Sequence, residues 1–162
     1  MEILGMSLGQ LLALLGAAFS VIMAGMGSAK GVSLAGQTSA GVSTENPEVN
    51  SKLMVLQILP GTQGIYGFLI GIIILVNTGA LGGEMKAVEL MQGFSFIAAA
   101  LPVGIVGYFS AAQQGKAAAA GMLMVGQHPD MSGKAIVMIV MVETYAVLAL
   151  LASFLMVNAI VL

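Results

Sequence analysis

The sequence predicts an all-α membrane protein with four transmembrane helices, arranged as two tandem-duplicated helical hairpins. Three observations predict this fold: the composition is too apolar for a water-soluble surface, four long apolar stretches are separated by turn-forming segments, and the two halves carry matching motifs. Of the 162 residues, 59% are hydrophobic and 7% are charged, whereas a soluble domain has about 25% charged residues. A lipid bilayer is the solvent that suits such a surface.

Each of the four stretches is long enough for a helix to cross the hydrocarbon core, which takes about 20 apolar residues. We expect the first helix over roughly Leu8–Ala29 and the second over about Leu53–Val76. The third is expected over about Leu90–Gln113, and the fourth runs from Ala135 to the end of the chain. A lysine next to each stretch is expected to mark a helix end.

The connecting segments 45–48, 77–84 and 127–130 each contain residues typical of turns: Asn and Pro in the first, Asn and Gly in the second, and Pro and Asp in the third. Lys30, Lys52, Lys116 and Lys134 flank the first and third connections, and Lys86 alone lies in the second. Because basic residues favour the cytoplasmic side, we expect loops one and three to be cytoplasmic and both termini to lie outside. The lysines form no basic run, so no nucleic-acid partner is expected.

The two halves of the chain repeat each other. Segment 46–52 resembles segment 128–134 at an offset of 82, and the surroundings of Lys30 resemble those of Lys116 at an offset of 86. We therefore expect a first hairpin in residues 1–80 and a second in residues 81–162, both in the same orientation. A four-residue difference in loop length is expected to reconcile the two offsets.

Small residues recur at four-residue spacing on the first and third predicted helices. These rows are Gly16, Ser20, Ala24 and Ser28; Gly27, Gly31 and Ala35; and Gly107, Ala111, Gly115 and Ala119. Such rows let helix backbones approach closely in lipid. Two interpretations stay open: ordinary packing within one chain, and a curved assembly in which the small-residue helices form the tight inner circumference and the bulkier helices face outward.

Glu143 is the one charged residue expected deep inside an apolar run, in segment 139–146. It follows Lys134 by nine residues, which is about 13 Å along a helix axis. A charged carboxylate at the bilayer centre costs roughly 2.5–3.5 kcal/mol on insertion scales. Protonation or a bound cation offsets this cost, so Glu143 is predicted to exchange a positive ion. The alternative is a structural carboxylate that is hydrogen-bonded inside the bundle.

The second predicted helix carries a polar cluster at the same depth. Pro60 has no N–H and weakens the helical hydrogen bonding, while Gly61 and Gly64 let a neighbouring helix come close. Thr62 and Gln63 supply a hydroxyl and an amide oxygen. At the offset of 82, Gly61 aligns with the carboxylate of the second half, so the first hairpin has lost that carboxylate. Gln113 and Gln114 lie near the cytoplasmic end of the third predicted helix. Two interpretations stay open: one of them turns towards the same site, or both are solvated residues at the helix end.

Segments 59–67 (Leu-Pro-Gly-Thr-Gln-Gly-Ile-Tyr-Gly) and 142–146 (Val-Glu-Thr-Tyr-Ala), with the runs 27–31 and 114–121, resemble the proteolipid of V-type and A-type rotary ATPases. This rotor-ring subunit is called K in prokaryotes and c elsewhere, and the resemblance covers almost the whole chain. Sodium-carrying K subunits of bacterial V-type ATPases are particularly similar.

The resemblance implies a homo-oligomeric rotor ring, surrounded by membrane lipid, in the cell membrane of a prokaryote. The ring would turn against a static membrane subunit that supplies an arginine, and a central-stalk subunit would meet its cytoplasmic loops. This chain contains no arginine, in keeping with its supply from another subunit. ATP hydrolysis or synthesis belongs to other subunits. This chain has no phosphate-binding loop motif and no expected catalytic site.

The resemblance also implies a set of sodium ligands and favours Gln114 over Gln113. These ligands are the Leu59 backbone carbonyl and the side chains of Thr62, Gln63, Gln114 and Glu143, with Tyr66 hydrogen-bonded to the carboxylate.

A proton needs little more than the carboxylate, whereas a sodium ion needs several oxygen ligands. We therefore predict sodium, with H⁺ as the alternative and no organic cofactor. A small secondary transporter or channel is the rival class, because duplicated hairpins and a midplane carboxylate occur there too.

Overall fold

The computed structural model describes residues 2–3 and 5–162, and helices dominate it. The first half contains a short strand pair, β1 (Glu2–Ile3) and β2 (Met6–Ser7), then α1 (Leu8–Glu45), η1 (Pro47–Val49), α2 (Asn50–Ile58), η2 (Leu59–Gly61) and α3 (Thr62–Asn77). The second half contains α4 (Leu90–Gln127), η3 (Pro129–Met131) and α5 (Ser132–Asn158). The η elements are single turns of 3₁₀-helix.

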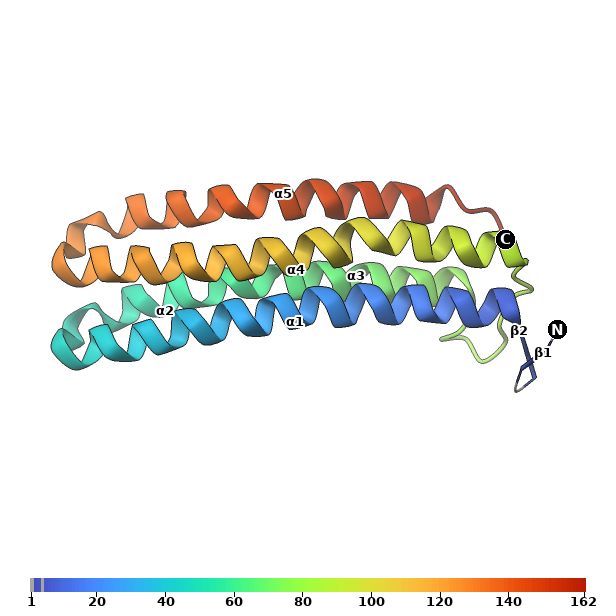
Figure 1. The fold of residues 1–162 in the computed structure, drawn as a ribbon, viewed down its shortest axis with the longest axis horizontal. Helices are drawn as coiled ribbons and strands as arrows, with labels where there is room; N and C mark the ends of the chain where they lie inside the picture. The colour runs from blue at the N-terminus through green and yellow to red at the C-terminus, as the bar shows by residue number, and fades with distance from the viewer. Residues whose placement is uncertain (1, 4) are drawn as a thin grey trace.

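Within the part of the chain that the structure describes, four helical segments are long and apolar enough to cross a membrane, which confirms the predicted fold class. They span Leu8–Glu45, Pro47–Asn77, Leu90–Gln127 and Pro129–Asn158. All four run along one axis (Figure 1). The loops at residues 46–49 and 128–131 lie at one end of the bundle, and both chain termini lie at the other end.

The helix ends differ from the prediction. The first helix does not end at Lys30 but continues to Glu45, and the third passes Lys116 and continues to Gln127. Both lysines are therefore exposed residues inside long helices, not helix ends. Hydropathy indicates only where the apolar segment ends, not where the helix ends. The helix itself continues because alanine-rich sequence and packing against α2 and α5 sustain it beyond that point.

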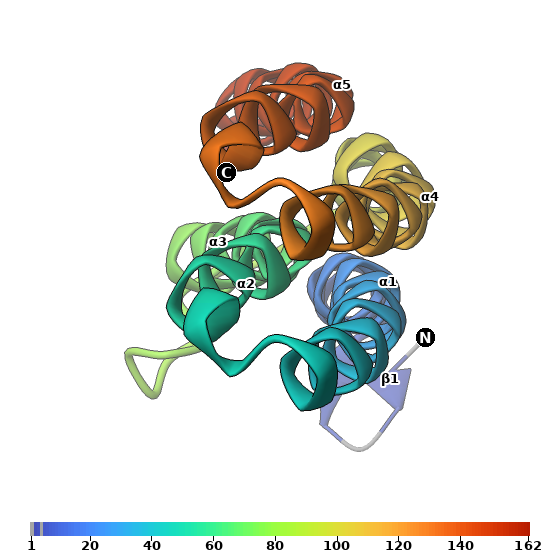
Figure 2. The same ribbon diagram turned by 90° about the vertical axis from the view of Figure 1, so that its left-hand side faces the viewer.

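Helices α1 and α4 lie against each other, and α2–α3 and α5 lie to one side of this pair (Figure 2). The α1 and α4 backbones touch at glycines. A Cβ atom on Gly27 would overlap the Tyr108 Cα, and one on Gly115 would lie 2.5 Å from the Gly31 Cα. These members of the small-residue rows therefore serve packing within one chain, which was one of the two open interpretations.

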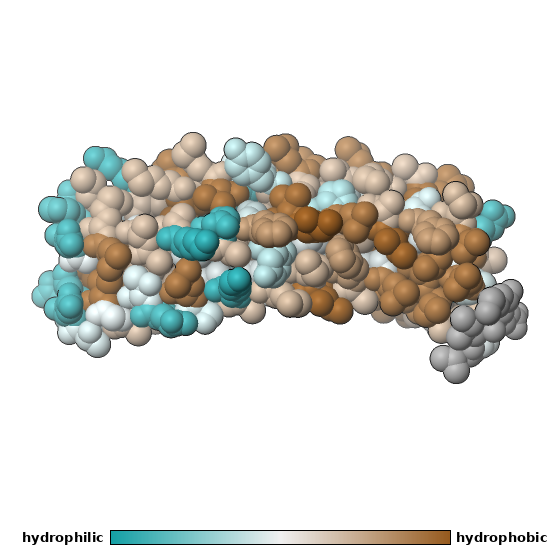
Figure 3. All heavy atoms as spheres, in the orientation of Figure 1, coloured by the Kyte–Doolittle hydropathy of each residue, from teal (hydrophilic) through white to brown (hydrophobic). Residues whose placement is uncertain are grey.

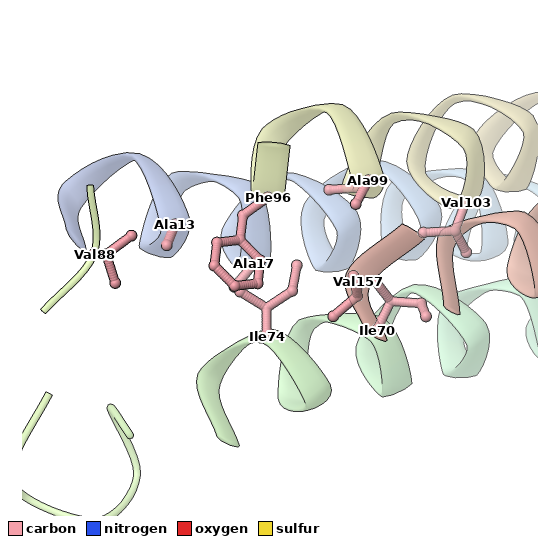
Figure 4. Close-up of a cluster of buried hydrophobic side chains, with 10 residues drawn as sticks. Ala13, Ala17, Ile70, Ile74, Val88, Phe96, Ala99, Val103 and Val157 are labelled. Atoms are coloured by element: carbon pink, nitrogen blue, oxygen red, sulfur yellow. The ribbon is translucent and has the colours of Figure 1, made fainter. Parts of the chain in front are cut away.

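Two apolar clusters fill the bundle. Figure 4 shows the cluster near the termini, where Ala17, Ile74 and Phe96 from three helices meet Val157 from the fourth. The cluster near the loops contains residues such as Leu53, Leu56, Met122 and Ile139. The buried polar side chains of Ser28, Gln63, Ser110 and Gln114 lie between these clusters along the helices, so the middle of the bundle contains a polar layer.

The structural repeat keeps a single offset. α1 begins at Leu8 and α4 at Leu90, and η1 begins at Pro47 and η3 at Pro129, so each pair is 82 residues apart. The helix starts are capped alike, by Ser7 with Gln10 and by Glu89 with Gln92. The offset of 86 and the expected loop-length difference are therefore wrong. A shift of four residues is close to one helical turn, so the lysine motifs look equivalent although they lie about 6 Å apart along the axis.

The surface is apolar over most of its length (Figure 3). Hydrophilic side chains gather at the loop end and on the adjoining part of this face, while the part nearer the termini is mostly hydrophobic. Many large apolar side chains point outward, among them Ile65, Leu148 and Leu155. Such a surface suits contact with lipid.

Candidate ion-binding site

The site begins at the break between α2 and α3. Pro60 cannot donate a backbone hydrogen bond, and the chain tightens into one 3₁₀ turn over Leu59–Gly61. Ser28 of α1 supports this turn from the side. Its hydroxyl accepts a hydrogen bond from the Gly64 N–H at 2.7 Å and donates one to the Gly61 carbonyl at 3.3 Å. The break therefore has an external partner for two of its backbone groups.

Oxygen atoms gather just after the break. The Thr62 hydroxyl donates to the Leu59 carbonyl at 3.0 Å and lies 3.4 Å from the Gln63 Oε1. Leu59 and Thr62 are both half-buried, while Gln63 is fully buried. A short stretch of one helix thus brings a carbonyl, a hydroxyl and an amide oxygen together.

Two buried amides connect this helix to α4. The Gln63 Nε2 donates to the Gln114 Oε1 and, at 3.3 Å, to the Ser110 hydroxyl. The Gln114 Nε2 donates to the Ile139 carbonyl and to the Glu143 Oε2, each at 3.3 Å. Because both glutamine side chains are fully buried, these hydrogen bonds replace the solvation that the amides lose.

Glu143, on α5, is the remaining member of the cluster. Its Oε1 accepts a hydrogen bond from the Tyr66 hydroxyl, and its Oε2 accepts one from Gln114. The carboxylate is half-buried and borders a mostly apolar hollow on the surface of α5, together with Val140, Thr144, Val147 and Leu148. One face of the carboxyl group therefore meets the polar layer, and the other approaches the apolar surface of α5.

All the side chains predicted for the ion site come together in this cluster, along with the Leu59 carbonyl. Gln114 lies inside it and Gln113 is exposed.

Sequence reasoning missed Ser110, and it treated Ser28 only as a small packing residue. Ser110 lies four residues before Gln114 and hence on the same helix face, a signal that could have found it. Ser28 is its counterpart at the offset of 82.

The chemistry of the cluster fits a small monovalent cation or a proton. It offers one carboxylate and several neutral oxygens, which are the ligand types of hard cations. Among residues 5–162, no group of three or more His, Cys, Asp or Glu side chains could hold a metal ion. A site with a single acidic ligand compensates a single positive charge.

A family model that describes the C subunit of ATP synthase matches residues 15–74 and, a second time, residues 97–156. The chain belongs to the ATP synthase C-subunit family. The two matches start 82 residues apart, which is the offset of the structural repeat. This C-subunit family member is therefore a tandem duplication, and each copy contributes one membrane hairpin.

Two curated proteins are similar to this chain over most of its length. It is 44% identical over 121 residues to the V-type sodium ATPase subunit K of Enterococcus hirae, covering 75% of this chain and 74% of the relative. It is 37% identical over 119 residues to the A-type ATP synthase subunit K of Methanocaldococcus jannaschii, covering 74% of this chain and 49% of that protein.

Proposed function

We propose that this protein is the rotor-ring subunit of a V-type ATPase and carries sodium ions across the membrane on Glu143. The observation that carries the proposal is the hydrogen-bonded chain that runs from the Leu59 carbonyl through Thr62, Gln63 and Gln114 to that carboxylate. The name of the Enterococcus hirae relative, a V-type sodium ATPase subunit, supports it.

Charge neutrality couples ion binding to rotation. Glu143 lies at the edge of the polar layer, next to the mostly apolar hollow on the surface of α5. With a cation bound, the carboxylate is neutralised and can face hydrocarbon. An empty, ionised carboxylate would cost roughly 2.5–3.5 kcal/mol or more in that position. Rotation through lipid is therefore permitted for loaded sites and opposed for empty ones.

The surplus of oxygen ligands favours sodium over a proton. A proton would need only the carboxylate oxygen that accepts it, and the Thr62 hydroxyl and the two amides would have no role in binding it. A dehydrated sodium ion takes its ligands from several oxygen donors. Thr62, Gln63 and Gln114 are the groups that meet this requirement here.

The partners follow from the same proposal. Identical copies would form the ring, with α1 and α4 on the inner circumference and α3 and α5 facing the surrounding lipid and the static subunit. An arginine of the static subunit would displace the ion from Glu143. The loops at 46–49 and 128–131, which Lys52 joins by donating to the Pro129 carbonyl at 2.8 Å, would be cytoplasmic and meet a central-stalk subunit. Both termini would lie outside.

Carbodiimide labelling of the purified assembly tests the choice of ion. Glu143 should be labelled in sodium-free buffer at neutral pH and protected by added sodium, because a bound cation and its oxygen ligands occupy the carboxylate. Glu143→Gln is the control for the site of labelling. If sodium gives no protection, the same ring would carry protons.

An unboiled gel tests the ring itself. A rotor-ring subunit should migrate as a large, detergent-resistant oligomer that collapses to the single chain on boiling. A monomer or small oligomer in mild detergent would contradict the ring and support a secondary transporter or channel.

A further inference from the structure

We propose that Ser110 is a positioning residue of the ion site, which orients the Gln63 amide so that its oxygen, and not its nitrogen, faces the cation. This inference rests on the sodium-carrying function proposed above. Ser110 lies on α4, is 7% exposed and is not one of the predicted ligands. It acts on the ion through Gln63.

The orientation follows from a chain of hydrogen bonds that starts at a backbone carbonyl. The Ser110 hydroxyl lies 3.0 Å from the Val142 carbonyl oxygen, which can only accept. The single hydroxyl hydrogen is therefore used there. Toward Gln63 the Ser110 oxygen can only accept, so it selects the Nε2 end of that amide, at 3.3 Å.

The same polarity continues through the second amide. The other Nε2 hydrogen of Gln63 goes to the Gln114 Oε1, and the Gln114 Nε2 ends on the Ile139 carbonyl and on Glu143. With its nitrogen fully used, Gln63 directs its Oε1 toward Thr62. A neutral oxygen then faces the position where the cation is expected.

Ser110 differs from Gln114 in one respect that gives it a separate role. Gln114 is itself a proposed ligand, so a bound cation competes for its Oε1 and weakens the hydrogen bond that this oxygen accepts from Gln63. Ser110 is hydrogen-bonded to the α5 backbone and is not a ligand, so cation binding leaves its hydrogen bond with Gln63 intact. Without the hydroxyl, the Gln63 amide can turn and present N–H groups to a cation, which removes one ligand and adds repulsion.

The test is the sodium concentration that halves carbodiimide labelling of Glu143 in the purified full-length assembly. Ser110→Ala should raise this concentration about five- to tenfold, the effect of losing one buried hydrogen bond. Labelling in sodium-free buffer should keep the wild-type rate, because the carboxylate itself is unchanged. Ser20→Ala is the matched control: Ser20 is also buried, but it bonds within its own helix to the Ala17 carbonyl.

A double-mutant cycle tests whether Ser110 acts through Gln63. In a Gln63→Ala background, Ser110→Ala should cause no further change, because the amide that it orients is gone. Ser110→Thr, which keeps a hydroxyl, should stay within about threefold of the wild type.

The outcomes separate this inference from the function on which it rests. If sodium fails to protect the wild-type protein, the proposed sodium function fails. If sodium protects it but Ser110→Ala matches Ser20→Ala, or lowers affinity equally with and without Gln63, the positioning role is overturned. Loss of the oligomer in Ser110→Ala alone would also overturn it, because Ser110 would then be required for the fold.

Discussion

The Tyr66 hydroxyl on α3 donates a hydrogen bond to the Glu143 carboxylate on α5. The bond joins the two hairpins, because the two residues are 77 positions apart in the chain. It also occupies one carboxylate oxygen and leaves the other toward Gln114.

Replacing Tyr66 with Phe should weaken sodium binding. The variant loses a hydrogen bond to a charged group, worth roughly 1.5–3 kcal/mol, so the half-protective sodium concentration should rise by about ten- to a hundredfold. Tyr145→Phe is the matched control, since Tyr145 is 67% exposed and lies two residues from Glu143. Equal effects of the two substitutions would contradict a role for Tyr66 in the site.

Replacing Gln63 with Ala should lower sodium affinity by more than tenfold and leave the ring assembled. The substitution removes a proposed ligand oxygen and the hydrogen-bond partner of Gln114, while the helices on either side keep their apolar contacts. The measurements are sodium protection and an unboiled gel, with the exposed Gln113→Ala as control. Loss of the oligomer would mean that Gln63 serves the fold instead of the ion.

Replacing Ser28 with Ala should disturb the break between α2 and α3. The partly buried Gly64 N–H loses its 2.7 Å partner, and an unpaired backbone group costs up to about 1–3 kcal/mol when it is buried. We expect a lower melting temperature and weaker sodium binding together, because the Leu59 carbonyl and Thr62 depend on this turn. The same substitution at Ser20 tests whether any buried α1 serine has this effect.

Replacing Gly27 with Ala should separate α1 from α4. The new Cβ would overlap the Tyr108 Cα, and because backbone cannot move aside cheaply, we expect a loss of about 1–3 kcal/mol or more. Gly25→Ala is the control, since a Cβ there meets nothing within 4 Å, and alanine favours the helix. Thermal unfolding in detergent measures both. A stable Gly27→Ala variant would show that this close approach is dispensable.

The sequence was sufficient to predict the four membrane-spanning segments, because the thickness of the hydrocarbon core sets the length that an apolar helix needs to cross it. It could not give the ends of α1 and α4, which continue for 15 residues beyond Lys30 and 11 beyond Lys116. Those ends depend on tertiary packing, not on hydropathy. The wrong offset of 86 had a related cause, since a motif displaced by one helical turn looks locally the same.

The site was predictable to the level of residue types and of their shared depth. Glu143 stood out as a charge in an apolar run, and Pro60 indicated the break that became η2. Choosing between Gln113 and Gln114 needed the family resemblance, because neighbouring residues on a helix face different directions and the sequence alone did not fix the rotation. Ser110 was missed because serine in a membrane helix usually serves packing or bonds its own backbone.

The constant offset of 82 between the hairpins has a consequence for how this protein can change. A protein made of one hairpin would present the same side chains at every step around an assembly, so any substitution would be copied everywhere. Here one copy can hold the acid, Glu143, while the other holds Gly61 at the matching position and carries Gln63 where the second copy has Tyr145. Duplication has separated two tasks that a single hairpin would have to perform at once, and each can be altered without altering the other.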